Sequence, residues 1–160
     1  MKVFKYKFTK TITVFIYLGL ALSVAAVAAD TYLVIAEGIK SAANPVYPII
    51  QYTLMYVVGI LLFIILLSLL LSSYYAIDGT TFKTSFGIIK SKYEVNKIQS
   101  IILDRTTGKL SVYFDENTFI VIVVKEEWYE DFIDELLKAN PKIEYSVKSK
   151  ENKPDDTEKK

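Results

Sequence analysis

Charged residues are almost absent from two long stretches in the first half of the chain. The first, residues 11–36, is interrupted only by Asp30, and the second runs without a charge from Ser41 to Ile77. A helix needs about 20 apolar residues to cross a hydrocarbon layer of roughly 30 Å, and in lipid its backbone groups must hydrogen-bond within the segment. The pattern therefore predicts two transmembrane helices, over residues 11–36 and 48–75, joined by an external loop over residues 37–47.

The first stretch also resembles a secretory signal peptide. Basic residues precede it, and Ala26 to Ala28 read Ala-Val-Ala, a pattern typical of a cleavage site. The stretch is longer than the ~7–15 apolar residues of a signal peptide, and small residues recur along it every four residues, which favours close packing against another helix. They form two rows, Gly19, Ser23 and Val27, and Ala21, Ala25 and Ala29. We interpret the stretch as a retained helix, and cleavage after residue 28 remains the alternative.

Asp30 is the one charged residue within the first stretch. Because it lies near the end of the stretch, we expect it at the membrane interface. A charged side chain deeper in a membrane costs free energy, and such residues mark functional sites. A functional intramembrane carboxylate is therefore the alternative interpretation of Asp30.

The charges that flank the two stretches predict how the chain is oriented. Residues 1–10 contain four lysines and no acid, whereas residues 37–47 contain only Lys40 and Glu37. Basic segments remain on the cytoplasmic side of a membrane. The sequence therefore predicts a multi-pass protein of the cell membrane, with a basic cytoplasmic arm over residues 1–10 and a cytoplasmic C-terminal part.

After residue 75 the pattern changes to the alternation of β-strands. Phe82, Thr84 and Phe86 alternate with Thr81, Lys83 and Ser85, which predicts a strand with one buried face. Four further strands are predicted between turn signals, over residues 88–95, 98–103, 110–114 and 118–124. The last is a continuous apolar run, as expected for a strand that is covered on both faces.

A helical pattern follows the strands. Large apolar residues recur at the spacing of one helical face, namely Trp128, Phe132 and Leu136. Asn140-Pro141 ends this predicted helix. The elements together predict an α+β fold, in which a small bent antiparallel sheet or barrel over residues 76–147 is capped by a C-terminal helix. Residues 148–160 are charged and contain no large apolar residue, so we expect them to be disordered.

The segment from Tyr74 to Glu144 resembles the pleckstrin-homology-like domains that occur attached to membrane helices in bacteria. Its two opening strands, YYAIDGTTFKTSFGIIKSKYEV, are joined at Gly87. Ile98 and Ile101 are similar to a pair of isoleucines three residues apart in that family. Trp128 to Ile143 resembles the family's final helix, which is followed by Asn-Pro-x-Ile.

The resemblance implies a bent sheet of about seven strands capped by a C-terminal helix. It implies little about function, because fold does not determine function. The residues to which it gives structural roles are Gly87 at the strand connection, Ile98 and Ile101 in the core, and Trp128, Phe132, Leu136 and Pro141 in the closing helix. In eukaryotic members, basic residues around the first hairpin commonly hold inositol phosphates, but the turn from Asp78 to Thr80 has no cation.

Composition narrows the possible chemistry. The 160 residues include no cysteine and no histidine, so disulfides, thiolate nucleophiles and the commonest general base and metal ligand are excluded. Nineteen basic and eighteen acidic residues nearly cancel, which does not favour a nucleic-acid binder. No phosphate-binding loop, dinucleotide fingerprint or hydrolase motif occurs. We therefore predict no catalytic residue, no cofactor and no metal.

Four lysines are candidates for contact with anionic lipid, namely Lys83, Lys90, Lys92 and Lys97. Each would contribute about 1 kcal/mol near such a surface. The alternative is an ordinary solvated face, which the balance of nine bases and twelve acids over residues 78–147 favours. For Asp104 and Arg105, neighbours at a predicted turn, we expect a surface ion pair rather than a catalytic pair.

These patterns favour a non-enzymatic protein that holds an interaction or scaffold domain at the membrane. We expect it to contact membrane lipid and a protein partner or a second copy of itself, and the resemblance suggests a role in envelope maintenance or stress. A sensor of anionic lipid is the first alternative. A subunit of a membrane enzyme or transport complex, using Asp30, is the second.

Overall fold

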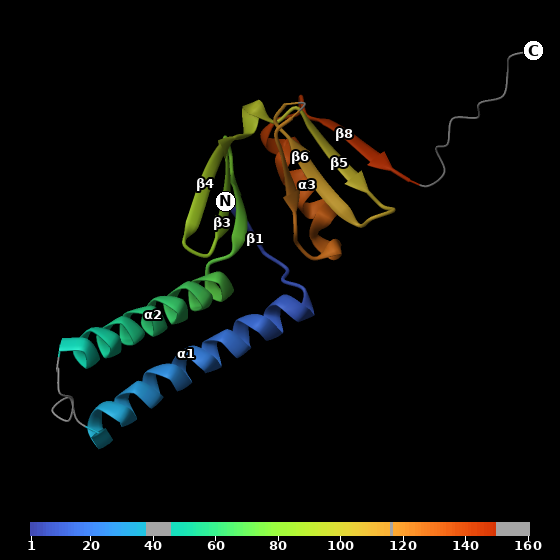
Figure 1. Ribbon diagram of the computed structural model, residues 1–160. Coiled ribbons are helices and arrows are strands. Elements are labelled where there is room, and N and C mark those ends of the chain that lie inside the picture. The colour runs from blue at the N-terminus through green and yellow to red at the C-terminus, as the bar shows by residue number, and fades with distance from the viewer. Residues whose placement is uncertain (38–45, 116, 150–160) are drawn as a thin grey trace, which may run out of the picture. The chain divides into compact units, whose positions relative to one another are not determined.

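The computed structural model of the protein describes residues 1–37, 46–115 and 117–149. Two compact units divide the chain (Figure 1). We call Phe8–Ser73 with Ser85–Ile89 the hairpin unit, and Met1–Lys7, Tyr74–Thr84 and the chain from Lys90 onward the sheet unit. The predicted α+β class is confirmed, because two long apolar helices precede most of the strands and a C-terminal helix.

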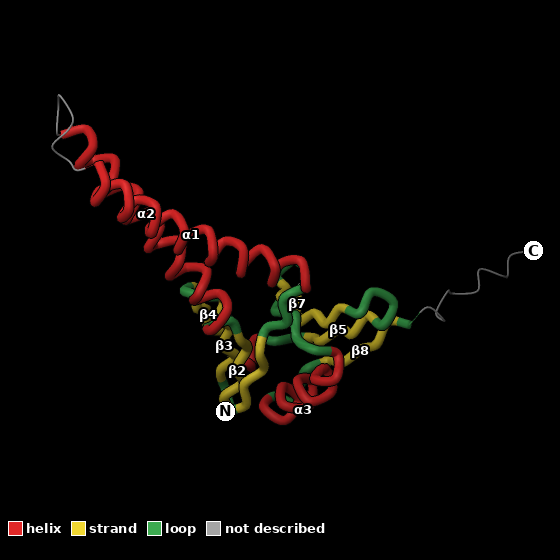
Figure 2. The backbone as a smooth tube through the Cα atoms, turned by 90° about the horizontal axis from the view of Figure 1, so that it is seen from below, coloured by secondary structure: helices red, strands yellow, loops and turns green. Residues whose placement is uncertain are grey.

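The hairpin unit contains helices α1 (Lys10–Glu37) and α2 (Val46–Leu71). They lie side by side (Figures 1 and 2). The spans Lys10–Ala36 and Pro48–Leu71 are long and apolar enough to cross a membrane, and only 11% and 6% of their most apolar windows are buried within the protein. Two long apolar helices are therefore confirmed, and most of their apolar surface is left without a protein partner among the described residues.

The predicted end of the second helix is wrong. We expected the helix to run to residue 75, but α2 ends at Leu71 and Tyr74 begins a strand. The Ser73 hydroxyl donates a hydrogen bond of 2.6 Å to the carbonyl of Leu69, which closes the last turn, and Tyr75 is buried in the sheet unit. Most of the predicted loop over residues 37–47 and of the predicted tail over residues 148–160 lies outside the described residues.

Eight strands in two four-stranded sheets make up the β-structure of the described residues. The first sheet has the order β1 (Lys2–Lys5), β2 (Tyr74–Asp78), β3 (Thr81–Phe86), β4 (Ile89–Glu94). The second has the order β7 (Phe119–Ile122), β6 (Lys109–Tyr113), β5 (Ser100–Asp104), β8 (Glu144–Lys148). The expectation of one antiparallel sheet of about seven strands is thus replaced by two sheets, and β8 pairs with β5 in parallel.

The N-terminal strand β1 was not predicted. We expected residues 1–10 to form a basic arm, but residues 2–5 pair with β2 in antiparallel register, with Phe4 opposite Tyr75. Phe4 is 3% exposed, and its ring lies 5.1 Å from that of Phe132 in an edge-to-face arrangement. Cleavage after residue 28 would remove strand β1 and the buried side chain of Phe4 from the sheet unit.

The two sheets meet beside β1 and β7. The backbone N–H of Lys7 donates to the carbonyl of Val123 over 2.8 Å. The Val123 N–H donates to the hydroxyl of Tyr75 over 3.3 Å, and that hydroxyl donates to the carbonyl of Val121 over 3.5 Å. These bonds join the two sheets at this edge, and the buried side chains of both sheets form one core cluster.

Helix α3 (Tyr129–Ala139) closes that core, preceded by the short helix η3 (Glu126–Trp128). The predicted closing helix is confirmed, and its Phe132 and Leu136 are completely buried. Ile98 and Ile101 are buried against it, whereas Trp128 is half-buried and Pro141 is exposed. The fully buried large side chains, which form the centre of the core, are Phe82, Phe132, Ile101, Leu110, Ile122, Leu136, Val95, Val112 and Val124.

The strand predicted over residues 118–124 is shorter and less buried than expected. Strand β7 covers only Phe119–Ile122, and Phe119 and Val121 are 52% and 37% exposed. Ile122 faces the core, so the strand is covered on one face. The expectation of two covered faces is wrong because the single closing helix occupies the inner side of this sheet only.

Replacement of Phe4 tests whether β1 is part of the folded unit. Phe4→Ala should lower the free energy of unfolding by about 3–4 kcal/mol, because a buried phenyl ring is lost from contact with Phe132. Val3→Ala is the matched control, since Val3 neighbours Phe4 but is 48% exposed. Denaturant unfolding of the full chain in detergent, followed by Trp128 fluorescence, measures the change in unfolding free energy of both variants. Equal effects would show that β1 does not belong to the core.

Tyr75 gives the sheet junction a dependence on pH. Burial raises the pKa of Tyr75 to about 12, while the hydrogen bond from the Val123 N–H lowers it and the charge of Tyr6 raises it further. An unfolded tyrosine has a pKa of about 10, so the contribution of the neutral phenol is complete below pH ~10 and is lost as the pH rises through ~12. Relative to Tyr75→Phe, the wild-type chain should lose about 2 kcal/mol of unfolding free energy between those values. Parallel pH dependences in denaturant titrations of the two proteins would contradict this.

Candidate functional site

The seam between α1 and α2 is closely packed at two glycines. A Cβ on Gly19 would lie 2.7 Å from Cδ1 of Leu66, and one on Gly59 would lie 2.9 Å from Cγ2 of Val27. Neither position accepts a side chain without a shift of its neighbour. Helices gain no hydrophobic free energy by associating in lipid, so close packing of this kind is what holds such a pair together.

Only one of the two predicted rows of small residues lies in the seam. Ser23 is 3% exposed, and Gly19 and Val27 contact α2 on the same side of α1. The other row is exposed, at Ala21, Ala25 and Ala29. A helix can carry two rows of small residues that have the same four-residue spacing. The spacing alone therefore does not determine which row packs against the partner helix.

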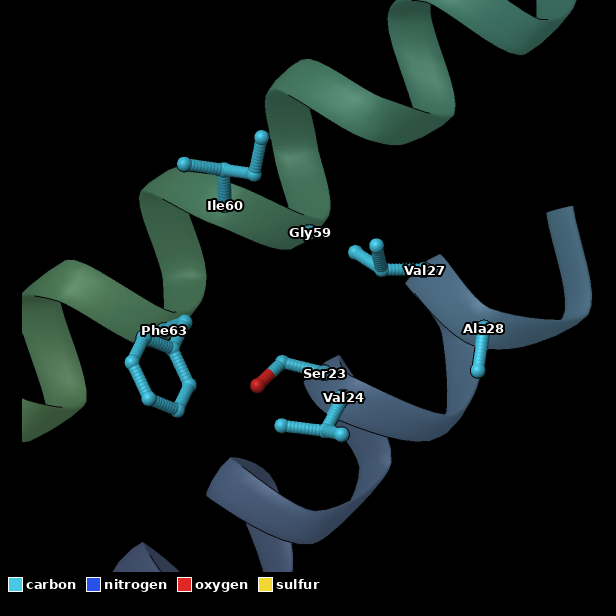
Figure 3. Close-up of a pocket in the computed structure, with 7 residues that line it drawn as sticks. All are labelled: Ser23, Val24, Val27, Ala28, Gly59, Ile60 and Phe63. Carbon is cyan, nitrogen blue, oxygen red and sulfur yellow. The ribbon is translucent and has the colours of Figure 1, made fainter. Parts of the chain in front are cut away.

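A cavity of about 330 Å³ lies between the two helices (Figure 3). Its lining is Ser23, Val24, Val27, Ala28, Gly59, Ile60 and Phe63. The residues that line the cavity include one polar side chain, that of Ser23. Its hydroxyl donates a hydrogen bond of 2.8 Å to the carbonyl of Leu20. The cavity therefore offers hydrocarbon contact and no group for chemistry.

Polar residues meet at the other end of the seam. The hydroxyls of Thr31 and Tyr56 lie 2.6 Å apart and join α1 to α2. Asp30 is 5% exposed, and its Oδ2 has no hydrogen-bond partner among the described residues. Because seven residues complete two helical turns, Asp30 lies on the same side of α1 as Ser23. The carboxylate that we expected at the membrane interface is therefore buried within the protein.

The four candidate lysines do not form one free cationic cluster. Lys83 lies 3.4 Å from a carboxylate oxygen of Asp78, and Lys97 lies 3.5 Å from Glu94. Lys90 and Lys92 are exposed on one face of β4, and in the described part of the chain neither forms an ion pair. Two of the four positive charges are therefore available to a lipid surface.

The acids of α3 form a solvated face. Lys2 of β1 lies 3.5 Å from Asp131 and 3.8 Å from Glu135, and Lys138 also pairs with Glu135 at 3.5 Å. Across the described residues, no three acidic side chains gather in a way that could hold a metal ion. Part of the predicted basic arm thus balances the acidic helix.

Two acids stabilise turns. Asp104 Oδ1 accepts bonds from the backbone N–H groups of Thr106 and Thr107, and the expected ion pair with Arg105 does not form. The pKa of Asp104 is lowered, first by the side chain of Thr107 and further by these backbone groups. The pKa of Asp115 is lowered in the same way, first by the N–H of Asn117. Both carboxylates are occupied structurally.

The outer side of the second sheet carries an apolar surface that the sequence did not predict. Its residues follow from the register, in which Tyr113 lies opposite Phe119, and Ser111 lies between Ile102 and Val121. The rings of Tyr113 and Phe119 stack with centroids 5.2 Å apart. We call Ile102, Tyr113, Phe119 and Val121 the apolar sheet face. The one feature of the sequence that indicated this face was the continuous apolar run of β7, and we interpreted that run as part of the core.

No family model matches the chain, and neither the curated proteins nor the solved structures include a significant match.

Proposed function

We propose that this chain is a two-span membrane protein that holds a non-catalytic interaction domain at the cytoplasmic face of the cell membrane. The observation that carries the proposal is the pairing of β1 with β2, because β1 precedes α1 and β2 follows α2. Two segments of one sheet lie on one side of a membrane. The two helices must therefore cross as a pair, leaving and returning to the same side.

The basic residues around β1 support the cytoplasmic orientation. Lysines are present at positions 2, 5, 7 and 10, before α1 or at its first residue. Because the sheet unit includes β1, the preference of this segment for the cytoplasm applies to the whole unit. Anchoring raises the effective concentration of the domain toward other membrane proteins without any additional contact.

The apolar sheet face supports an interaction role. Phe119 is 52% exposed and stacks on Tyr113, and Val121 of the same face is 37% exposed. Aromatic residues grouped on a surface are typical of the centre of a protein interface. The absence of histidine and cysteine from the sequence further favours binding over catalysis.

Membership of the bacterial pleckstrin-homology-like family is part of this proposal. The C-terminal helix that closes the core agrees with what the resemblance implies, whereas two four-stranded sheets stand in place of the one bent sheet of about seven strands. The suggested role in envelope maintenance or stress rests on that resemblance alone.

A sensor of anionic lipid is the second candidate, favoured by the exposed Lys90 and Lys92 on one face of β4. It predicts salt-sensitive affinity for anionic vesicles. The third candidate, a subunit of a membrane enzyme or transport complex, is favoured by the buried Asp30.

Labelling of single cysteines tests the topology, since the chain has no cysteine of its own. With a membrane-impermeant maleimide applied to intact cells, Ser41→Cys should react, because position 41 lies between the helices. Val3→Cys and Thr80→Cys should react only after lysis, because β1 and the turn between β2 and β3 belong to one cytoplasmic unit. Reaction of the latter two in intact cells would reverse the orientation, and opposite behaviour of positions 3 and 80 would overturn the paired crossing.

Crosslinking in cells tests the interaction role. A photoreactive residue in place of Phe119 should give a discrete protein adduct, whereas the same residue at Thr80, which is exposed on the other sheet, should not. Val121→Ser should reduce the adduct at position 119 several-fold by removing neighbouring apolar contact. Two differently tagged copies distinguish self-association from a second protein. An absence of adducts at both positions would contradict the proposal.

A further inference from the structure

The turn between β3 and β4 exposes apolar side chains where polar ones are expected. Phe82 and Phe86 lie on the same face of β3, yet Phe82 is completely buried and Phe86 is 44% exposed. Ile88 and Ile89 follow at 61% and 71% exposure. Residues 84–89 contain no charge. Contiguous exposed apolar residues of this kind mark an interaction site. We call residues 86–89 the apolar turn.

Hydrogen bonds fix the apolar turn to the end of α2. The N–H of Gly87 donates to the Ser73 hydroxyl over 3.1 Å, and that hydroxyl donates to the carbonyl of Leu69 over 2.6 Å. The Ser85 hydroxyl donates to the carbonyl of Ser72 over 2.6 Å. The connection between β3 and β4 and the end of α2 therefore share one hydrogen-bond network within the hairpin unit.

Close packing also holds the apolar turn against the end of α2. Gly87 has a φ of +60°, which disfavours other residues, and a Cβ there would lie 3.3 Å from Cα of Leu69. Leu71, the last residue of α2, is 72% exposed. Phe8, just before α1, places its ring 6.0 Å from that of Phe86. Phe8, Leu71 and the apolar turn therefore bring apolar side chains together at the ends of the two helices.

We propose that the apolar turn is a third contact with the membrane and inserts Phe86, Ile88 and Ile89 into the interfacial layer of the bilayer. This inference rests on the proposed function, because the bilayer must surround α2 up to Leu71. Lipid is the occupant that the surface fits, since the turn continues the uncharged surface of the helix that lipid would cover.

The residue after the apolar turn supports a position of the turn at the membrane interface. Lys90 follows Ile89 directly and is exposed. A lysine adjoining an inserted apolar segment extends its charge to the headgroup phosphates while its stem stays in apolar contact.

Depth-dependent quenching in vesicles tests this contact. Full-length Ile88→Cys and Ile89→Cys variants, each with an environment-sensitive fluorophore, are reconstituted in phosphatidylcholine and phosphatidylglycerol vesicles with nitroxide lipids. Thr80→Cys at the turn between β2 and β3 is the exposed control, and Val58→Cys within α2 is the control for membrane crossing. All four positions are exposed, so the labels need not disturb the core.

We expect labels at positions 88 and 89 to lose several-fold more emission than the label at position 80, most strongly with nitroxide near the headgroup. The label at position 58 should be quenched best by a deep nitroxide. If position 58 is quenched while 88 and 89 behave like 80, the third contact is overturned and the anchoring stands. If position 58 is not quenched, both proposals are overturned. Blue-shifted but unquenched emission at 88 and 89 would identify a protein as the occupant and also overturn the inference.

Discussion

The pairing of β1 with β2 is the constraint on which the rest of this structure depends. Four residues before α1 join a strand that begins only after α2, with Phe4 buried opposite Tyr75. The chain must therefore leave the sheet unit, form the helical hairpin and return to the adjacent strand position. A short strand thereby ties the ends of a long insertion, and the entropy lost in closing that loop must be repaid by core contacts such as that of Phe4 with Phe132.

The two units are stabilised by different physics. In the sheet unit, burial of apolar side chains between two sheets and α3 provides the driving force, and Phe132 and Leu136 are completely removed from solvent. In the hairpin unit most apolar side chains remain exposed, and the helices meet through Gly19, Gly59 and a hydroxyl pair. That surface suits lipid, in which close packing and polar contacts, rather than exclusion of water, associate helices.

Several elements were predictable because their signal is local. The lengths of the apolar stretches predicted α1 and α2, and the spacing of Trp128, Phe132 and Leu136 predicted α3. The errors arose where burial depends on distant partners. Phe86 and Phe119 have the hydrophobicity of core residues, but Phe86 is 44% exposed at the end of β3 and Phe119 is 52% exposed on the outer face of its sheet. Ala21, Ala25 and Ala29 equalled the seam residues in spacing and proved exposed.

Taken by itself, the amino-acid sequence determined the class of each segment, since charge-free length, alternation and helical spacing are properties of neighbouring residues. It also determined which chemistry is missing, because no histidine or cysteine occurs. Tertiary structure alone decided that residues 2–5 are a strand, that the sheets join through Lys7 and Tyr75, and that the apolar turn meets the end of α2. The contacts between strands join residues 46 to 116 positions apart, and the contact of the turn with α2 joins Gly87 to Ser73, 14 positions away. No local pattern encodes which distant partner a strand or a turn will find.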